Sequence, residues 1–143
     1  MSDGPVRLAF VCVRNAGRSR MATAFAERER DRRGLGDRVE ILTGGTDPAE
    51  AVHDVVVTAM AEVGLDVSER VPRAISAAEL RACDRVATMG CSTLDLGVDP
   101  GAAGVEVEDW ALDDPAGRDL DAVRAIRDET GRRVVALFDD LAD

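Results

Sequence analysis

The chain contains no lysine and no tyrosine, and phenylalanine and tryptophan make up only 3% of its 143 residues. Every basic residue is therefore arginine, and 18 of them face 28 acidic residues, which gives a formal net charge of −10. Such a surface disfavours nucleic acid and anionic membranes as partners. It suits a cytoplasm of high salt concentration, although genomic base composition would explain the missing lysine equally well.

Cysteine and histidine are also scarce, with Cys12, Cys83, Cys91 and the single histidine, His53. An odd, sparse set of cysteines argues against a disulfide scaffold. Because there is no Cys-x-x-Cys pair, we predict no metal site and no cofactor. We expect Cys83 to be a core residue and His53 to be a surface residue where a helix starts.

Long apolar runs are missing, since none approaches the roughly 20 residues of a membrane-spanning helix. The first five residues lack the basic and apolar regions of a signal peptide, so we expect a cytoplasmic protein. Residues 1–143 are enough for one domain with a substantial core.

The most informative stretch is residues 12–19, Cys-Val-Arg-Asn-Ala-Gly-Arg-Ser, here called the anion loop. It joins an apolar run at 6–13 to a helix-like run at 19–33. In so short a loop the backbone N–H groups can curl around one centre, and the helix N-terminus adds a positive dipole end. Gly17 tolerates the backbone angles that such a curl needs. The predicted oxyanion-binding residues are Val13, Arg14, Asn15, Ala16, Gly17 and Arg18.

Cys12 and Arg18 give this loop its predicted chemistry. The planar guanidinium of Arg18 fits two oxygens of phosphate or arsenate. Cys12 lies at the floor of the loop, where the same field favours thiolate over thiol, so we expect it to be a nucleophile at neutral pH. A cysteine ending a buried strand is usually only a small apolar residue, but the joint pattern favours the functional interpretation.

Strand-like and helix-like segments alternate along the whole chain. Apolar runs predict strands at 6–13, 39–43, 85–88 and 105–107, and helical periodicity predicts helices at 19–33, 50–63, 77–82 and 120–141, with a loop at 92–104. Ser76 and Glu79 form a capping box for the third helix. This order predicts an α/β fold, a three-layer sandwich with a four-stranded parallel sheet. The loop at 43–48 then lies at the edge where such sheets bind ligands.

Asp114 is the candidate proton donor. When Cys12 displaces an oxygen from phosphorus or arsenic, that oxygen needs a proton. A carboxyl held by Pro115 and partly desolvated near an anion would carry one. Without further context, Asp-Asp-Pro is also a common turn.

Three segments, 12–19, 43–48 and 109–117, together resemble the low-molecular-weight protein tyrosine phosphatase superfamily, which includes thioredoxin-coupled and mycothiol-coupled arsenate reductases. The resemblance covers nearly the whole chain and implies a four-stranded parallel sheet with helices on both faces. It implies roles for five residues: Cys12 as nucleophile, Arg18 as oxyanion clamp, Ser19 as hydrogen-bond partner of the thiolate, Asn15 as loop brace and Asp114 as general acid.

Within that superfamily the chain looks like the arsenate reductase branch. Tyrosine phosphatases usually carry aromatic residues where this chain has Ala116 and Gly117, and residues 88–91 and 122–129 resemble the reductases. Thioredoxin-coupled reductases use two further cysteines, whereas no cysteine follows Cys91 here. An external thiol or redox protein is therefore the expected reductant. Cys91 could form a disulfide with Cys12, or could be a buried residue of a turn.

The sequence thus predicts an arsenate reductase in which Cys12 attacks arsenate and Asp114 protonates the departing oxygen. The alternative is a phosphatase acting on phosphotyrosine or small phosphate esters through a phosphocysteine. A non-catalytic oxyanion sensor is a third interpretation. It is disfavoured because anion binding alone requires neither Cys12 nor Asp114.

Overall fold

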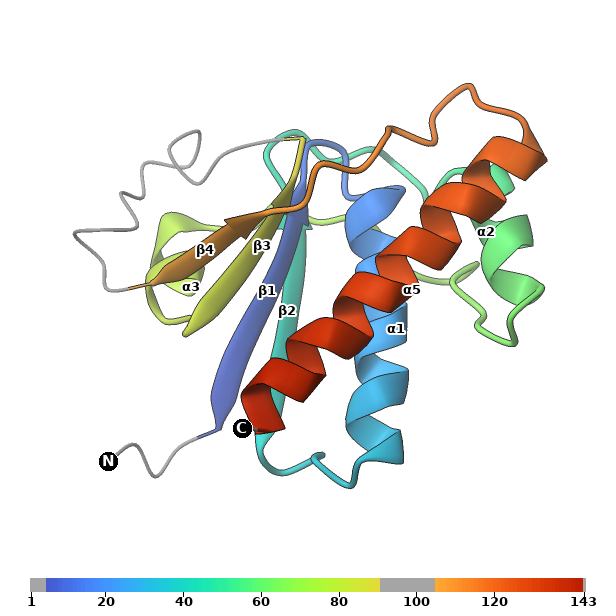
Figure 1. Ribbon diagram of the computed structural model, residues 1–143. Helices are drawn as coiled ribbons and strands as arrows, with labels where there is room; N and C mark the ends of the chain where they lie inside the picture. Colours follow the sequence, from blue (N-terminus) through green and yellow to red (C-terminus); the bar gives the residue numbers. More distant parts are fainter. Residues whose placement is uncertain (1–4, 91–104, 143) are drawn as a thin grey trace.

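The fold is built on one parallel sheet, seen in a computed structural model that describes residues 5–90 and 105–142. Its strands have the order β2-β1-β3-β4, and every neighbouring pair is parallel (Figure 1). The strands are β1 (Val6–Cys12), β2 (Val39–Gly45), β3 (Arg85–Met89) and β4 (Glu106–Asp109). The helices are α1 (Arg18–Arg32), α2 (Asp54–Ala61), α3 (Ala77–Arg81) and α5 (Leu120–Ala142).

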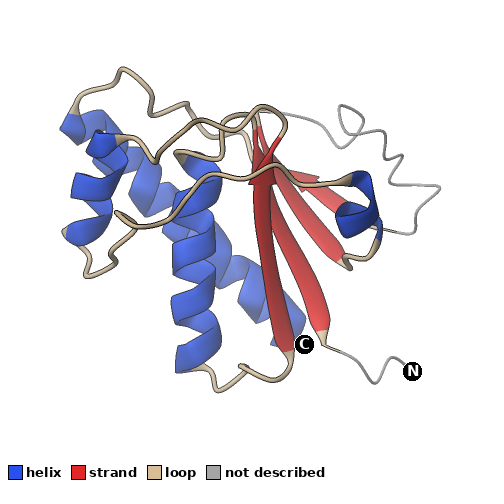
Figure 2. Ribbon diagram, turned by 180° about the vertical axis from the view of Figure 1, so that it is seen from behind, coloured by secondary structure: helices blue, strands red, loops and turns tan. Residues whose placement is uncertain are grey.

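The side chains of β1 alternate between two cores, as a strand covered on both faces requires. Leu8, Phe10 and Cys12 belong to the larger core, which they share with residues of α1, α2 and α5. Ala9 and Val11 belong to a smaller core on the α3 side. Helices therefore cover both faces of the sheet (Figure 2), and the predicted three-layer sandwich is confirmed.

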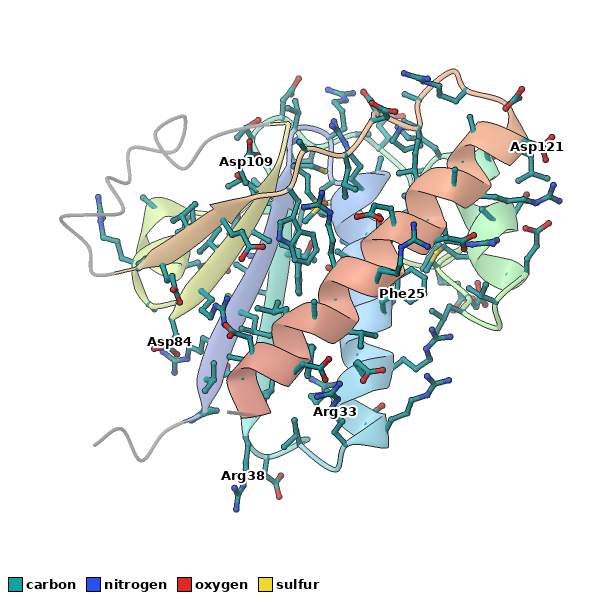
Figure 3. The ribbon with its side chains drawn as sticks, viewed as in Figure 1. Phe25, Arg33, Arg38, Asp84, Asp109 and Asp121 are labelled. Carbon is teal, nitrogen blue, oxygen red and sulfur yellow. The ribbon has the colours of Figure 1, made fainter. Side chains whose placement is uncertain are left out.

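Gly131 allows α1 and α5 to pack closely. A methyl group at Gly131 of α5 would lie 3.3 Å from the ring of Phe25, a residue of α1 that is labelled in Figure 3. Charged side chains such as Asp84 and Asp109 lie exposed at opposite ends of the sheet. No helix in the described part of the chain is both long and apolar enough to cross a bilayer.

The element boundaries differ from the predicted ones in instructive places. Helix α1 begins at Arg18, one residue before the predicted start, with Gly17 as its N-cap residue. The Ser19 hydroxyl contacts Cys12 and Asn15 inside the anion loop. The second helix is shorter than the predicted 50–63, since residues before Asp54 bind the loop backbone. The Ser76–Glu79 capping box is present as predicted. The loop predicted at 92–104 lies outside the described residues.

Candidate active site

Cys12 is the last residue of β1, and its sulfur is held by the loop that follows. The side chain is buried. Its Sγ lies 2.8 Å from Ser19 Oγ, and the backbone N–H of Asn15 donates a hydrogen bond to the same sulfur at 3.2 Å. The structure therefore brings together the cysteine and the serine that the sequence picked out.

The anion loop keeps its N–H groups on the inner side because its carbonyls are bonded outward. In a planar trans peptide the C=O and N–H point in opposite directions, so an outward carbonyl directs the next N–H inward. Residues 46–53, which follow β2, supply the donors. The bonds are Thr46 N–H to Cys12 O (3.2 Å), Asp47 N–H to Val13 O (2.8 Å), Ala49 N–H to Arg14 O (2.9 Å) and His53 N–H to Ala16 O (3.0 Å).

Asn15 is the residue that bends the loop. It has a left-handed φ of 53°, which asparagine tolerates better than most residues. Gly17 has φ −139° and ψ −96°, a pair outside the helical and extended regions, as expected for the residue that tolerates the curl. The fully buried Asn15 side chain donates to Ser19 Oγ at 2.7 Å and to Thr43 Oγ1 at 2.9 Å. Its Oδ1 accepts the backbone N–H of Arg73 at 3.0 Å. Asn15 thus braces the loop, as the resemblance implied.

Arg18 extends over the loop with a side chain only 12% exposed. Its Nη1 donates to the carbonyl of Leu112 at 3.0 Å, and its Nη2 lies 3.8 Å from Asp114 Oδ2. Gly90, with a φ of +81°, leaves room for the guanidinium, because a methyl group there would come within 2.7 Å of both terminal nitrogens. The cation is therefore held at the end of β3 and next to the carboxylate.

The loop that carries Asp114, residues 110–117, is here called the aspartate loop. Trp110 anchors it, since this fully buried ring lies 5.7 Å from the ring of Phe10. Asp114 Oδ1 accepts the N–H of Ala116 at 3.0 Å, which fixes the carboxylate in a turn. The Asp114 side chain is 59% exposed, and its Oδ2 lies on the side of the Arg18 guanidinium.

These groups enclose a cavity of about 270 Å³ with Cys12 among its walls. Such a volume admits a tetrahedral oxyanion. Among the described residues, those that line the cavity include no phenylalanine, tyrosine or tryptophan. They are Cys12, Val13, Arg14, Gly17, Arg18, His53, Gly90 and Asp114.

His53 departs from its prediction in part. It does precede α2 as the N-cap residue, but it is half-buried and lines the cavity rather than the outer surface. Arg14 lies at the rim, where its Nη1 pairs with Asp47 Oδ2 at 2.7 Å. Ala16 is buried behind the loop and contributes its backbone alone.

Several residues that build the site were not named individually as site residues, although the sequence placed the 43–48 loop at the ligand-binding edge. Thr43 bonds Asn15, and Gly45 lies so close to the loop that a methyl group there would meet the Val13 carbonyl at 2.4 Å. The run Thr-Gly-Gly-Thr after an apolar strand was a signal for such a close approach. Gly90 and Arg73 carried no comparable local signal.

Cys83 and Cys91 are not part of the described cavity lining. Burial, reinforced by the charge of Asp84, raises the pKa of the Cys83 thiol to about 11, so it stays protonated and inert in the smaller core. Cys91 lies outside the described residues. In the described ranges 5–90 and 105–142, no group of three or more His, Cys, Asp and Glu side chains could hold a metal ion.

Comparison with known proteins places this geometry in a family. The profile of "Low molecular weight phosphotyrosine protein phosphatase" matches residues 7–96. A Halobacterium salinarum protein described as "Putative arsenate reductase" is 59% identical over 139 residues, covering 97% of this chain and 95% of that protein. "Arsenate reductase 2" of Staphylococcus epidermidis is 33% identical over 120 residues, covering 84% and 86%.

A solved structure supports the same grouping. The thioredoxin-dependent arsenate reductase of Corynebacterium glutamicum superimposes with a TM-score of 0.78 at 29% identity. The match covers 99% of this chain, which spans 64% of that longer chain.

Proposed function

Because the chain belongs to the low molecular weight phosphotyrosine protein phosphatase family, we propose that it is an arsenate reductase that uses Cys12 as its nucleophile. The observation that carries the proposal is the position of Cys12 Sγ. The sulfur accepts a hydrogen bond from the Asn15 N–H, lies 2.8 Å from Ser19 Oγ, and lines the same cavity as the Arg18 guanidinium. That combination binds a tetrahedral anion and attacks its central atom.

The first chemical step forms an S–As bond. The Cys12 thiolate attacks arsenic while Arg18 and the loop N–H groups hold the remaining oxygens. One As–O bond breaks, and Asp114 supplies the proton that lets this oxygen leave as water. Arsenic is still pentavalent at this stage, so no electrons have yet been transferred.

The second step needs another thiol. When that thiol attacks the Cys12 sulfur, the electron pair of the S–As bond stays on arsenic, which departs as trivalent arsenite. The proton of the incoming thiol is released, and Cys12 is left in a disulfide with it. A further thiol then reduces this disulfide and is itself oxidised, so two thiols together supply the two electrons.

The incoming thiol is an external low-molecular-weight thiol or a thioredoxin-like protein. No cysteine follows Cys91 in the chain. Cys91, which lies outside the described residues, is the alternative source of the attacking sulfur, as the sequence suggested. The proposal includes a cytoplasmic location, where such thiols are kept reduced.

Phosphate ester hydrolysis is the second candidate. The same Cys12 and Arg18 would form a phosphocysteine, and Asp114 would then activate water. The absence of phenylalanine, tyrosine and tryptophan from the described cavity lining favours a small oxyanion over an aryl ester. An anion sensor would need neither the nucleophile nor the acid.

Two assays on the purified protein separate these functions. One measures arsenate-dependent oxidation of a dithiol or of reduced thioredoxin, and the other measures hydrolysis of an aryl phosphate. We expect arsenate-dependent oxidation that Cys12→Ser abolishes. Ester hydrolysis without arsenate reduction would establish the phosphatase instead, and full activity of Cys12→Ser in both assays would overturn both. Mass mapping of disulfides after arsenate exposure tests Cys91.

A further inference from the structure

Arg20 is a buried arginine whose charge is not used in the cavity. It lies on α1 two residues beyond Arg18, and only 6% of it is exposed. In the described part of the chain it has no carboxylate at ion-pair distance, and its Nε has no hydrogen-bond partner. A buried cation without a carboxylate is unfavourable, so its presence calls for a compensating role.

The Nη2 of Arg20 donates to the carbonyl of Val71. Val71 begins a segment, residues 71–75, that returns along the outer edge of β2. There Gly45 N–H donates to Arg73 O at 2.9 Å, and Arg73 Nη1 donates to Thr43 O at 2.8 Å. Arg20 therefore fixes the start of a segment that binds the end of β2.

The same segment reaches the nucleophile through Asn15. The Arg73 N–H bonds Asn15 Oδ1 at 3.0 Å, and Asn15 in turn contacts Ser19 Oγ through its amide and Cys12 Sγ through its backbone N–H. If residues 71–75 were displaced, Asn15 Oδ1 would lose the hydrogen bond that it accepts from the Arg73 N–H. That loss would free the one left-handed residue of the loop, on which the direction of the loop N–H groups depends.

The charges around Arg20 also couple it to Cys12. Burial lowers the pKa of Arg20, and the nearby cations Arg70 and Arg73 lower it further, whereas Glu27 and Cys12 act to raise it. Arg70 and Arg73 have their own carboxylate partners, Glu27 and Glu79, and Arg20 does not. A negative sulfur at Cys12 is thus one of the few charges that favour the buried cation, and this attraction is mutual.

We propose that Arg20 is a positioning residue for Cys12, holding residues 71–75 against the back of the anion loop so that Asn15 keeps its hydrogen bond to the sulfur. The inference rests on the proposed function only in taking Cys12 as the nucleophile. It concerns the reactivity of the sulfur and not the identity of the oxyanion.

The test follows alkylation of Cys12 by iodoacetamide as a function of pH, with the modified peptide quantified by mass spectrometry so that Cys83 and Cys91 are counted separately. For Arg20→Met we expect the alkylation rate at neutral pH to fall about tenfold and the pH profile to differ from that of wild type. Arg20→Lys keeps the charge and should recover part of the rate. Arg32→Met, at an exposed arginine of the same helix, should leave the profile unchanged.

A profile of Arg20→Met that coincides with wild type would overturn the proposal while leaving the proposed function intact. If Arg20→Met does not fold, the alkylation profiles of Arg20→Gln and Arg20→Lys are compared with that of wild type. Three coinciding profiles would overturn the proposal. If wild type fails to reduce arsenate but the expected change in the profile is seen, the proposed function fails and the positioning role stands.

Discussion

Gly17 and Pro115 lie so close that a methyl group on Gly17 would come within 2.7 Å of Pro115 Cγ. The anion loop and the aspartate loop therefore share a contact surface, and the missing side chain of Gly17 sets the position of Asp114. Since Pro115 is buried, the proline ring has little freedom to move aside.

Gly17→Ala should accordingly push the aspartate loop away from the cavity. We expect the rate of adduct formation at Cys12 to fall about 100-fold, because displacement of a reacting group by about 1 Å has an effect of this size. Gly36→Ala is the matched control, since nothing lies within 4 Å of a methyl group there. Stopped-flow measurement with an aryl phosphate reports adduct formation, and similar rates for both variants would contradict the shared surface.

Asp114→Asn keeps the shape of the aspartate loop and removes the proton. Loss of a general acid lowers rates by about 100-fold to 10,000-fold. We therefore expect a decrease in that range for adduct formation at Cys12 when a phosphate ester with a poor leaving group is the substrate. A leaving group that departs without a proton should show a much smaller effect. Asp113→Asn, at the exposed neighbour, serves as control, and equal loss in both variants would argue against a specific proton donor.

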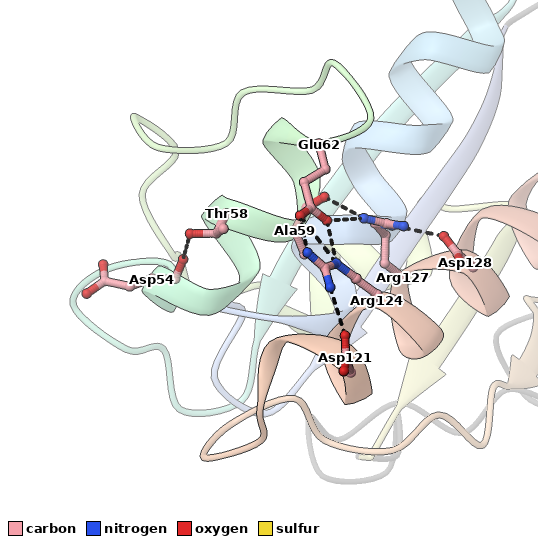
Figure 4. Close-up of polar contacts among 8 residues, drawn as sticks. All are labelled: Asp54, Thr58, Ala59, Glu62, Asp121, Arg124, Arg127 and Asp128. Atoms are coloured by element: carbon pink, nitrogen blue, oxygen red, sulfur yellow. Dashed lines mark hydrogen bonds and ion pairs between the residues drawn. The ribbon is translucent and has the colours of Figure 1, made fainter.

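Glu62 joins α2 to α5 through two arginines (Figure 4). Its carboxylate accepts hydrogen bonds from Arg124 at 2.6 Å and from Arg127 at 2.9 Å. The Arg124 bonds, assisted by Arg127, lower the pKa of Glu62 from 4.5 to about 2. A lowered carboxylate pKa stabilises the fold above the unfolded value, and that contribution is lost as pH falls towards the folded value.

We therefore expect Glu62→Gln to melt below wild type at neutral pH, with a difference that narrows as pH falls from about 4.5 to about 2. Solvent screening keeps the effect modest, since these side chains are partly exposed. Thermal melts across this pH range make the measurement, with Glu69→Gln at an exposed carboxylate as control. A difference that stays constant with pH would exclude the ionised pair as its source.

The excess of acidic residues predicts that salt stabilises the protein. A net charge of −10 repels itself in the folded state, and added salt shortens the screening length from about 10 Å at about 0.1 M to about 3 Å at about 1 M. We expect the melting temperature to rise along a KCl series. An equal rise of the melting temperature in sucrose would show that preferential exclusion of the solute, and not charge screening, stabilises the protein. A melting temperature that does not change with KCl would leave genomic base composition as the explanation for the missing lysine.

Much of this architecture could be predicted because its determinants are local. The alternation of apolar runs and helical periods, with the capping box at Ser76, is sufficient for the order of elements and the parallel sheet. Cys12, Asn15, Arg18 and Ser19 are adjacent in sequence, so their convergence needed no tertiary information. Helix α1 starts at Arg18, one residue before the predicted Ser19, and the Ser19 hydroxyl contacts Cys12 and Asn15 within the anion loop.

The remaining contributions come from segments far along the chain, and sequence patterns carry no distances. His53 was expected on the surface, but its N–H bonds Ala16 and brings its ring to the cavity wall. Arg73 reaches Asn15 across 58 positions, and Gly90 meets Arg18 only because β1 and β3 are neighbours. Each depends on which elements pack together, which composition and periodicity do not specify.

Strand β4 forms one margin of the described sheet, and its sequence is Glu-Val-Glu-Asp. Glu106, Glu108 and Asp109 are all exposed along it. A second molecule that tried to extend the sheet in register would bring rows of carboxylates together, and like charges on a strand margin oppose such pairing. These three carboxylates therefore oppose fibre-like self-association along this margin of the described sheet.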